Sequence, residues 1–202
     1  MTTRSHHVRV VLATRNAHKI DELRRILAPY DIELVGLPDD APDVEETGAT
    51  FIDNALLKAR AAAASTGSIA IADDSGIAVD ALNGMPGVLS VYWAGRARDD
   101  AANLRLVLEQ IEDVPDERRG AAFLCAAAAA TPDGREVAVE GRLDGALLRS
   151  PRGKGGFGYD PIFVPTGSTQ TTAEMTAEEK DAISHRGRAF RALVPQLLEL
   201  LS

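Results

Sequence analysis

A chain of 202 residues and 21.5 kDa is long enough for one domain with a sizeable core, and a content of 45% hydrophobic and 26% charged residues excludes a disordered chain. Thirty acidic residues against 22 basic ones give a net charge of −8, which argues against non-specific binding to nucleic acid or to anionic membranes. A single cysteine excludes an intramolecular disulfide. Residues 1–16 hold no apolar run long enough for a signal peptide or a membrane span. We therefore expect one cytoplasmic domain over residues 1–202.

The N-terminal part of the sequence predicts a strand, a helix and a second strand. Residues 8–13 form a short apolar run that is typical of a buried strand. Asn16 follows as a helix cap, and Pro29 ends the helix behind it. A second strand is expected over residues 32–37. This alternation indicates an α/β protein.

A helix and a strand are expected after an acidic loop over residues 38–47. Thr50 and Asp53 have the spacing of a capping box, so a helix begins there, and Gly67 ends it. The apolar residues 69–72 then predict a strand that stops at the Asp-Asp-Ser-Gly sequence behind it.

The second half of the sequence predicts a helix, a hairpin and two further elements. Apolar residues at helical spacing mark a helix over 104–111. Residues 121–130 and 136–142 flank a Pro-Asp-Gly turn, which favours a β-hairpin although alanine has a high helix propensity. A short strand over 161–165 and a final helix opening at Ser184 complete an α/β fold with a mixed sheet and flanking helices.

Two polar clusters follow expected strands and suggest a site. Residues 14–19 bring a hydroxyl, an amide and a lysine to a helix N-terminus, where backbone N–H groups favour anions. Asp73 and Asp74 point to opposite faces of a strand, so one carboxylate can hold Mg²⁺ while the other is held by neighbours, and Glu46 can add a ligand. The alternative interpretations are a simple Asn cap with a solvated lysine, and an acidic turn.

Two later clusters carry features of a ligand site. Residues 153–160 place four glycines around two aromatic residues, so backbone can approach a flat ligand while Phe157 or Tyr159 offers a stacking face. Asp160 can then accept hydrogen bonds from ring N–H groups. Residues 184–186, Ser-His-Arg, present donors at a helix start, although a cap with solvated charges is the simpler interpretation of that segment alone.

Six segments in this order resemble the inosine triphosphate/xanthosine triphosphate pyrophosphatase family: TRNAHK (14–19), EETGATFIDNALLKA (45–59), ADDSG (72–76), PGVLS (86–90), GGFGYDPIF (155–163) and EEKDAISHRG (178–187). The resemblance implies an elongated mixed α/β fold with two lobes around a central cleft, usually as a homodimer. It also implies Mg²⁺-dependent hydrolysis of the nucleoside triphosphates ITP, dITP and XTP to a monophosphate and pyrophosphate.

The resemblance also implies roles for individual residues. Asp74 would be the metal-linked general base, with Glu46 as a second metal ligand. Phe157 would stack on the base, while Arg186 would donate to the purine O6, which adenine lacks. The full set of expected substrate-binding residues is Thr14, Arg15, Asn16, Lys19, Lys58, Ser75, Phe157, Gly158, Tyr159, Asp160, Lys180, His185 and Arg186.

One position departs from the family pattern, and two other functions remain open. Tyr92 stands where relatives commonly carry arginine, so Arg96 or Arg98 would have to replace that contact, unless Tyr92 packs at a dimer surface. A Maf-like nucleotide pyrophosphatase is the alternative enzyme, which the GGFGYD and SHRG segments argue against. A non-catalytic nucleotide-binding module is the alternative without chemistry.

Overall fold

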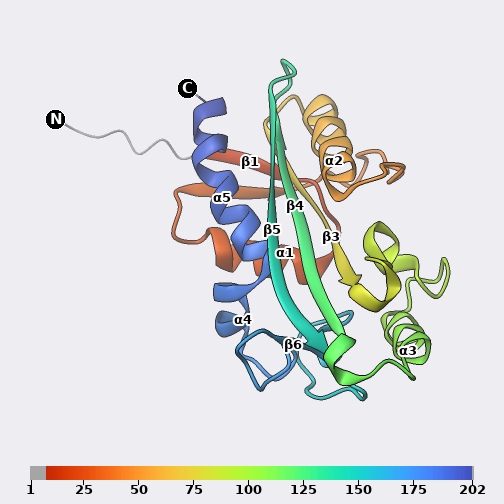
Figure 1. The fold of residues 1–202 in the computed structure, drawn as a ribbon. Helices are drawn as coiled ribbons and strands as arrows, with labels where there is room; N and C mark the ends of the chain where they lie inside the picture. The colour runs from red at the N-terminus through yellow and green to blue at the C-terminus, as the bar shows by residue number, and fades with distance from the viewer. Residues whose placement is uncertain (1–7, 202) are drawn as a thin grey trace. The chain divides into compact units, whose positions relative to one another are not determined.

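The computed structural model describes residues 8–201, and within that range six strands form one mixed sheet in the order β2-β1-β3-β4-β5-β6 (Figure 1). The strands are β1 (Val8–Leu12), β2 (Ile32–Gly36), β3 (Ala70–Val79), β4 (Gly120–Ala130), β5 (Glu136–Leu147) and β6 (Phe163–Pro165). The helices are α1 (Ala17–Leu27), α2 (Phe51–Thr66), α3 (Asp100–Gln110), α4 (Ala177–Ile183) and α5 (His185–Leu200). The predicted α/β class is confirmed. The segment ahead of Val8, in which we expect no leader, lies outside the described residues.

The predicted caps form as the sequence indicates. The Asn16 side chain accepts a hydrogen bond from the backbone N–H of Lys19 and begins α1. Thr50 and Asp53 make a reciprocal capping box at the start of α2, and Gly67 ends that helix in a left-handed conformation. These local signals set the helix ends, because a cap satisfies backbone groups that the helix itself leaves without a partner.

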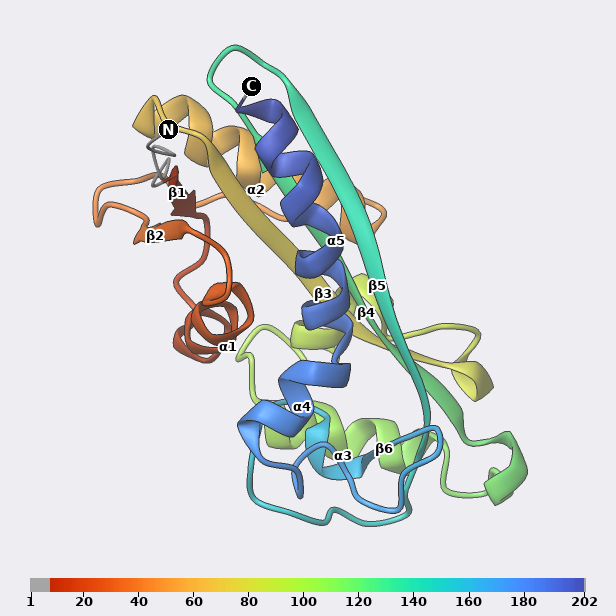
Figure 2. The same cartoon turned by 90° about the vertical axis from the view of Figure 1, so that its left-hand side faces the viewer.

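Contacts group the described chain into two compact units, and each is described by itself. Unit 1 comprises residues 8–74, 126–140 and 187–201. In this unit β1 pairs in parallel with both β2 and β3, and Figure 2 shows β1 and β2 side by side with α1 next to them. The interior contains the apolar faces of β1, α1 and α2, including the fully buried Val10, Leu23 and Ala59.

Unit 2 comprises residues 75–125 and 141–186. Its core gathers apolar side chains from the end of β3, from α3 and from the hairpin strands, among them Ile77, Val107 and Leu143. Phe123 and Phe163 pack with ring centroids 4.4 Å apart. The predictions of a single domain and of a central cleft stay predictions.

Three elements differ from the sequence-based expectation. The prediction that the strand ends before Asp73 is wrong, because β3 continues through the Asp-Asp-Ser-Gly sequence to Val79. Residues 160–162 form a 3₁₀ turn, so the strand expected from Pro161 begins only at Phe163. The short helix α4, which starts with a capping box between Thr176 and Glu179, was not expected.

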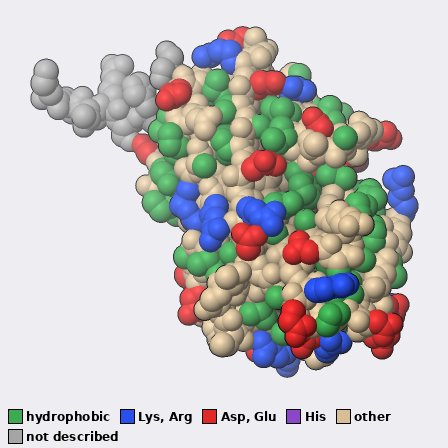
Figure 3. Space-filling model, in the orientation of Figure 1, with side chains coloured by type: hydrophobic (Ala, Val, Ile, Leu, Met, Phe, Trp, Pro, Cys, Tyr) green, Lys and Arg blue, Asp and Glu red, His purple; other side chains and the backbone are tan. Residues whose placement is uncertain are grey.

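The final helix and the surface complete the fold. Ser184 lies in extended conformation directly before α5, and Pro195 lies inside this helix without ending it. On the face drawn in Figure 3, acidic and basic side chains are interspersed among apolar atoms. Within the described part of the chain, no helix combines the length and the apolar character needed to cross a lipid bilayer.

Candidate active site

Asp74 lies in the middle of β3, buried to 6% exposure, and two residues of α2 contact it. The Asn54 side-chain amide donates to Asp74 Oδ2 over 3.0 Å, and the Lys58 ammonium lies 3.3 Å from Asp74 Oδ1. Asn54 and Lys58 are four residues apart, so they occupy the same face of the helix. Lys58 therefore lies beside Asp74, and its predicted contact with the substrate stays a prediction.

Lys58 also joins Asp74 to Glu46, which lies in the loop before α2. Its Nζ is 2.9 Å from Glu46 Oε1, so one ammonium group bridges two carboxylates. Burial raises the pKa of Asp74 and Glu46 raises it further, against the opposing effects of Lys58, Lys19 and Asn54. Burial acts to lower the pKa of Lys58, but the charges of Asp74, Asp73 and Glu46 outweigh it and raise that pKa. The pKa of Lys58 and that of Asp74 therefore each depend on the charges of their neighbours in this cluster.

The loop that carries Glu46 approaches α2 closely at Gly48. The backbone N–H of Gly48 donates to Asn54 Oδ1 over 2.7 Å, while the other end of the Asn54 amide donates to Asp74. A Cβ atom at Gly48 would lie 2.5 Å from the Cβ of Asp53 and 2.7 Å from Asn54 Oδ1. Only glycine allows the loop to come this close to α2. The Asn54 side chain then links the loop that carries Glu46 to the strand that carries Asp74, because it hydrogen-bonds to both.

Asp73 faces the other side of β3, as strand alternation predicts. Its carboxylate pairs with Lys19 of α1 over 2.9 Å, with the Lys19 side chain 15% exposed and that of Asp73 fully buried. Lys19 is therefore not a solvated lysine, and Asp73 and Asp74 are held in mid-strand rather than in an acidic turn. Lys19 of α1 and Lys58 of α2 therefore reach this part of β3 from opposite faces.

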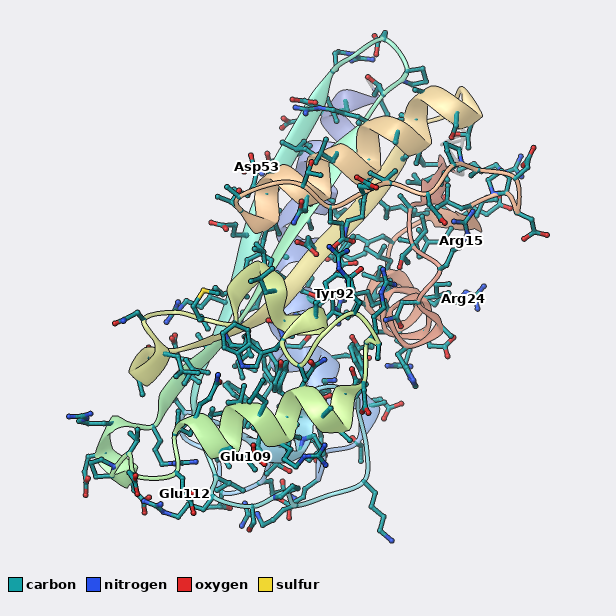
Figure 4. All side chains as sticks on the ribbon, turned by 90° about the vertical axis from the view of Figure 1, so that its right-hand side faces the viewer. Arg15, Arg24, Asp53, Tyr92, Glu109 and Glu112 are labelled. Carbon is teal, nitrogen blue, oxygen red and sulfur yellow. The ribbon has the colours of Figure 1, made fainter. Side chains whose placement is uncertain are left out.

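The other residues of the 14–19 segment make local contacts. The Thr14 hydroxyl accepts from the Asn16 N–H, and Asn16 caps α1. Arg15 turns toward the acidic loop after β2, where it pairs with Asp43 and donates to the Ala41 carbonyl over 2.7 Å (Figure 4). The structure therefore gives Arg15 a contact that holds the loop leading to Glu46.

Unit 2 contains a second cluster, centred on the buried Asp160. Its Oδ2 accepts from the Lys180 ammonium over 2.6 Å and from the Phe157 N–H over 2.8 Å, and its Oδ1 accepts from the Thr172 hydroxyl over 2.7 Å. Gly156 has a φ of +67°, and a Cβ there would lie 2.0 Å from Asp160 Oδ2. Both carboxylate oxygens accept hydrogen bonds from groups of the protein, so Asp160 holds the glycine-rich loop, and its predicted contact with a base stays a prediction.

Two cations lie against the Phe157 ring. Lys180 Nζ is 5.1 Å and the Arg186 guanidinium carbon 5.7 Å from the ring centroid. Arg186 is buried and donates to the Ser75 hydroxyl over 2.8 Å, and the His185 ring stacks on Phe123 at 4.9 Å. The structure thus brings together Phe157, Lys180 and Arg186, and it places Lys180 beside the aromatic ring.

The remaining loop residues have structural partners. The Tyr159 ring belongs to the core of unit 2, and its hydroxyl donates to the Ser90 carbonyl over 2.8 Å. Burial, with a smaller contribution from Asp100, raises the Tyr159 pKa far above its ordinary value. The Gly158 N–H donates to Asp100 Oδ2 over 2.9 Å, so the first turn of α3 also holds the loop.

Tyr92 contacts Arg96 and Arg98, the two residues proposed above to take over the role of the arginine that relatives carry at this position. The guanidinium carbons of Arg96 and Arg98 lie 5.7 Å and 5.0 Å from its ring centroid, and Arg98 also donates to its hydroxyl. Tyr92 therefore anchors both side chains in unit 2.

Sequence reasoning missed two contacts at these clusters. The sequence places Asn54 one helical turn before Lys58, on the same face of the helix, but its hydrogen bond to Asp74 was not predicted. Asp100 gave no signal, because an acidic residue in the first turn of a helix has a sufficient local explanation.

A family model, curated relatives and solved structures all point to the same family. The model of the Ham1 family matches residues 10–196. A dITP/XTP pyrophosphatase of Streptomyces coelicolor is 61% identical, over 96% of this chain and 98% of that protein, and one of Mycobacteroides abscessus is 56% identical, over 96% and 97%. The solved structure of a HAM1 protein from Coxiella burnetii matches with a TM-score of 0.86 at 42% identity, covering 95% of this chain and 99% of that one. The chain therefore belongs to the Ham1 family.

Proposed function

We propose that this protein is a pyrophosphate-releasing hydrolase that converts dITP, XTP and ITP to the monophosphate and removes them from the nucleotide pool. The observation that carries the proposal is the pair of carboxylates, Asp74 and Glu46, held together by Lys58. Relatives that are 53–61% identical over nearly the whole chain are named dITP/XTP pyrophosphatases. Membership of the Ham1 family favours this function over a Maf-like enzyme.

In the proposed reaction, Asp74 accepts a proton from the water that attacks the α-phosphorus. The new bond joins the water oxygen to that phosphorus, and the bond to the bridging oxygen breaks and releases pyrophosphate. Lys19 and Lys58 supply positive charge to the triphosphate, and the start of α1 supplies N–H donors. Burial makes Asp74 a stronger base than an exposed carboxylate, because the neutral form is favoured there.

The donors at Asp74 and Glu46 fit Mg²⁺. In the described residues no group of three or more His, Cys, Asp or Glu is arranged to hold a metal. Mg²⁺ is commonly held by one or two carboxylates, with phosphate oxygens and water filling the other positions, so two carboxylates suffice when a nucleotide is present. When bound, the metal would neutralise charge on the phosphates.

The base would be recognised by the second cluster. Phe157 offers its ring for stacking, and Arg186 is a donor suited to the O6 of hypoxanthine or xanthine, where adenine carries an amino group. Asp160 and Lys180 act behind this surface by fixing the glycine-rich loop. The resemblance to dimeric enzymes, together with the exposed Met85, Leu89 and Val91, supports a homodimer, and we place the protein in the cytoplasm because it would act on the free nucleotide pool.

The test is pyrophosphate release from dITP, XTP, ITP, ATP, GTP and dTTP, each measured with Mg²⁺ and with EDTA. We expect release from the three deaminated purine nucleotides, little from the others, and loss in EDTA that added Mg²⁺ reverses. Release without preference for deaminated purines would contradict the assigned base recognition. Binding of dITP without release would favour the nucleotide-binding module.

Phe157→Ala tests the stacking surface. Because stacking of a base on an aromatic ring contributes about 1–3 kcal/mol, we expect kcat/KM for dITP to fall by a factor of about 5 to 150. Phe157→Tyr retains the ring and should keep most of the wild-type value. Equal kcat/KM for wild type and Phe157→Ala would show that the base does not rest on this ring.

A further inference from the structure

Lys58 occupies the position where the two proposed metal ligands converge. Its ammonium lies 2.9 Å from Glu46 Oε1 and 3.3 Å from Asp74 Oδ1, and its side chain is only 13% exposed. The Asn54 amide donates to the other oxygen of Asp74. Both carboxylates therefore have Lys58 as a cationic partner.

A divalent cation that binds these carboxylates competes with this ammonium. Both seek the same oxygen atoms, and two cations held a few ångströms apart repel each other strongly where burial limits screening by water. The cation can bind well only if Lys58 moves to another anionic partner. In the proposed reaction, the phosphates of the substrate are that partner.

We propose that Lys58 is an internal substitute for the metal ion, which occupies the Glu46 and Asp74 carboxylates until a triphosphate draws its ammonium away. This rests on the proposed function for the identity of the triphosphate, but the competition at the two carboxylates is a property of the protein alone. The metal then binds together with the nucleotide and not before it. Lys58 thereby couples metal binding to substrate binding.

The proposal is tested by titrating the substrate-free protein with Mn²⁺, a paramagnetic probe for Mg²⁺, and measuring free Mn²⁺ by electron paramagnetic resonance. For the wild type we expect a Kd weaker than about 10⁻⁴ M, at the weak end of oxygen-ligand cation sites. Lys58→Gln removes the competing charge, so Mn²⁺ should bind about tenfold more tightly or better. Tight binding of Mn²⁺ by the wild type that Asp74→Asn abolishes would overturn the proposal without any need for a folded Lys58 variant.

Arg60→Gln is the matched control, since it removes one positive charge from the same helix. Arg60 is exposed and pairs with Glu136, so its loss should change the Mn²⁺ affinity by less than about twofold. An unchanged or weaker affinity in folded Lys58→Gln would overturn the proposal. If the wild type nevertheless hydrolyses dITP with Mg²⁺, that result would overturn only the proposed role of Lys58 and leave the proposed function standing. Tighter binding in Lys58→Gln without turnover by the wild type would instead contradict the proposed function and support the competition.

Discussion

Asp74→Asn is expected to lower the rate of pyrophosphate release from dITP by a factor of about 10²–10⁴, the usual contribution of a positioned general base. The amide has nearly the same shape as the carboxylate and can still accept the hydrogen bond from Asn54. It cannot take a proton from water, and it brings no negative charge to a metal. We therefore expect kcat to fall, as measured by steady-state pyrophosphate release at saturating dITP and Mg²⁺.

Asp144→Asn is a suitable control for this experiment. Asp144 lies on β5 in an exposed ion pair with Arg142, so the loss of its charge should leave the rate unchanged. Thermal unfolding of both variants checks that the fold is retained. A rate for Asp74→Asn within about threefold of the wild type would be too small a loss for a general base and would remove Asp74 from that role.

Lys180→Met should cause the largest loss of stability among the changes considered. Lys180 and Asp160 are 6% and 2% exposed and lie 2.6 Å apart, so the substitution leaves a buried carboxylate without its cation. Breaking such a pair costs about 3–5 kcal/mol of unfolding free energy. For a chain of this size we expect the unfolding temperature to fall by about 6–20 °C, as measured by calorimetry or circular dichroism.

Two further variants separate the ion pair from simple loss of packing. Adding Asp160→Asn to Lys180→Met removes the buried charge and should restore a large part of the lost stability. Arg135→Met breaks the exposed pair with Asp133 and should cost less than about 1 kcal/mol. If the double variant is no more stable than Lys180→Met, the cost arises from packing and not from the unpaired carboxylate.

Several helix ends and the family could be predicted from the amino-acid sequence alone. Asn16, Thr50 with Asp53, and Gly67 set helix ends because a cap acts within one turn of its own position. The alternation of side chains along a strand correctly placed Asp73 and Asp74 on opposite faces. The six motifs identified the family, which the relatives and the family match confirm.

The partners of the polar side chains could not be predicted from the sequence and are seen only in the folded chain. The strand β3 runs on through Asp73 and Asp74 because lysines from α1 and α2 neutralise both carboxylates, which local propensity cannot anticipate. Asp160 turns inward because Lys180, 20 residues later, supplies its cation, and Arg15 binds a loop 26–28 residues away. These pairings join residues that are distant in sequence, and only the folded chain brings such residues together.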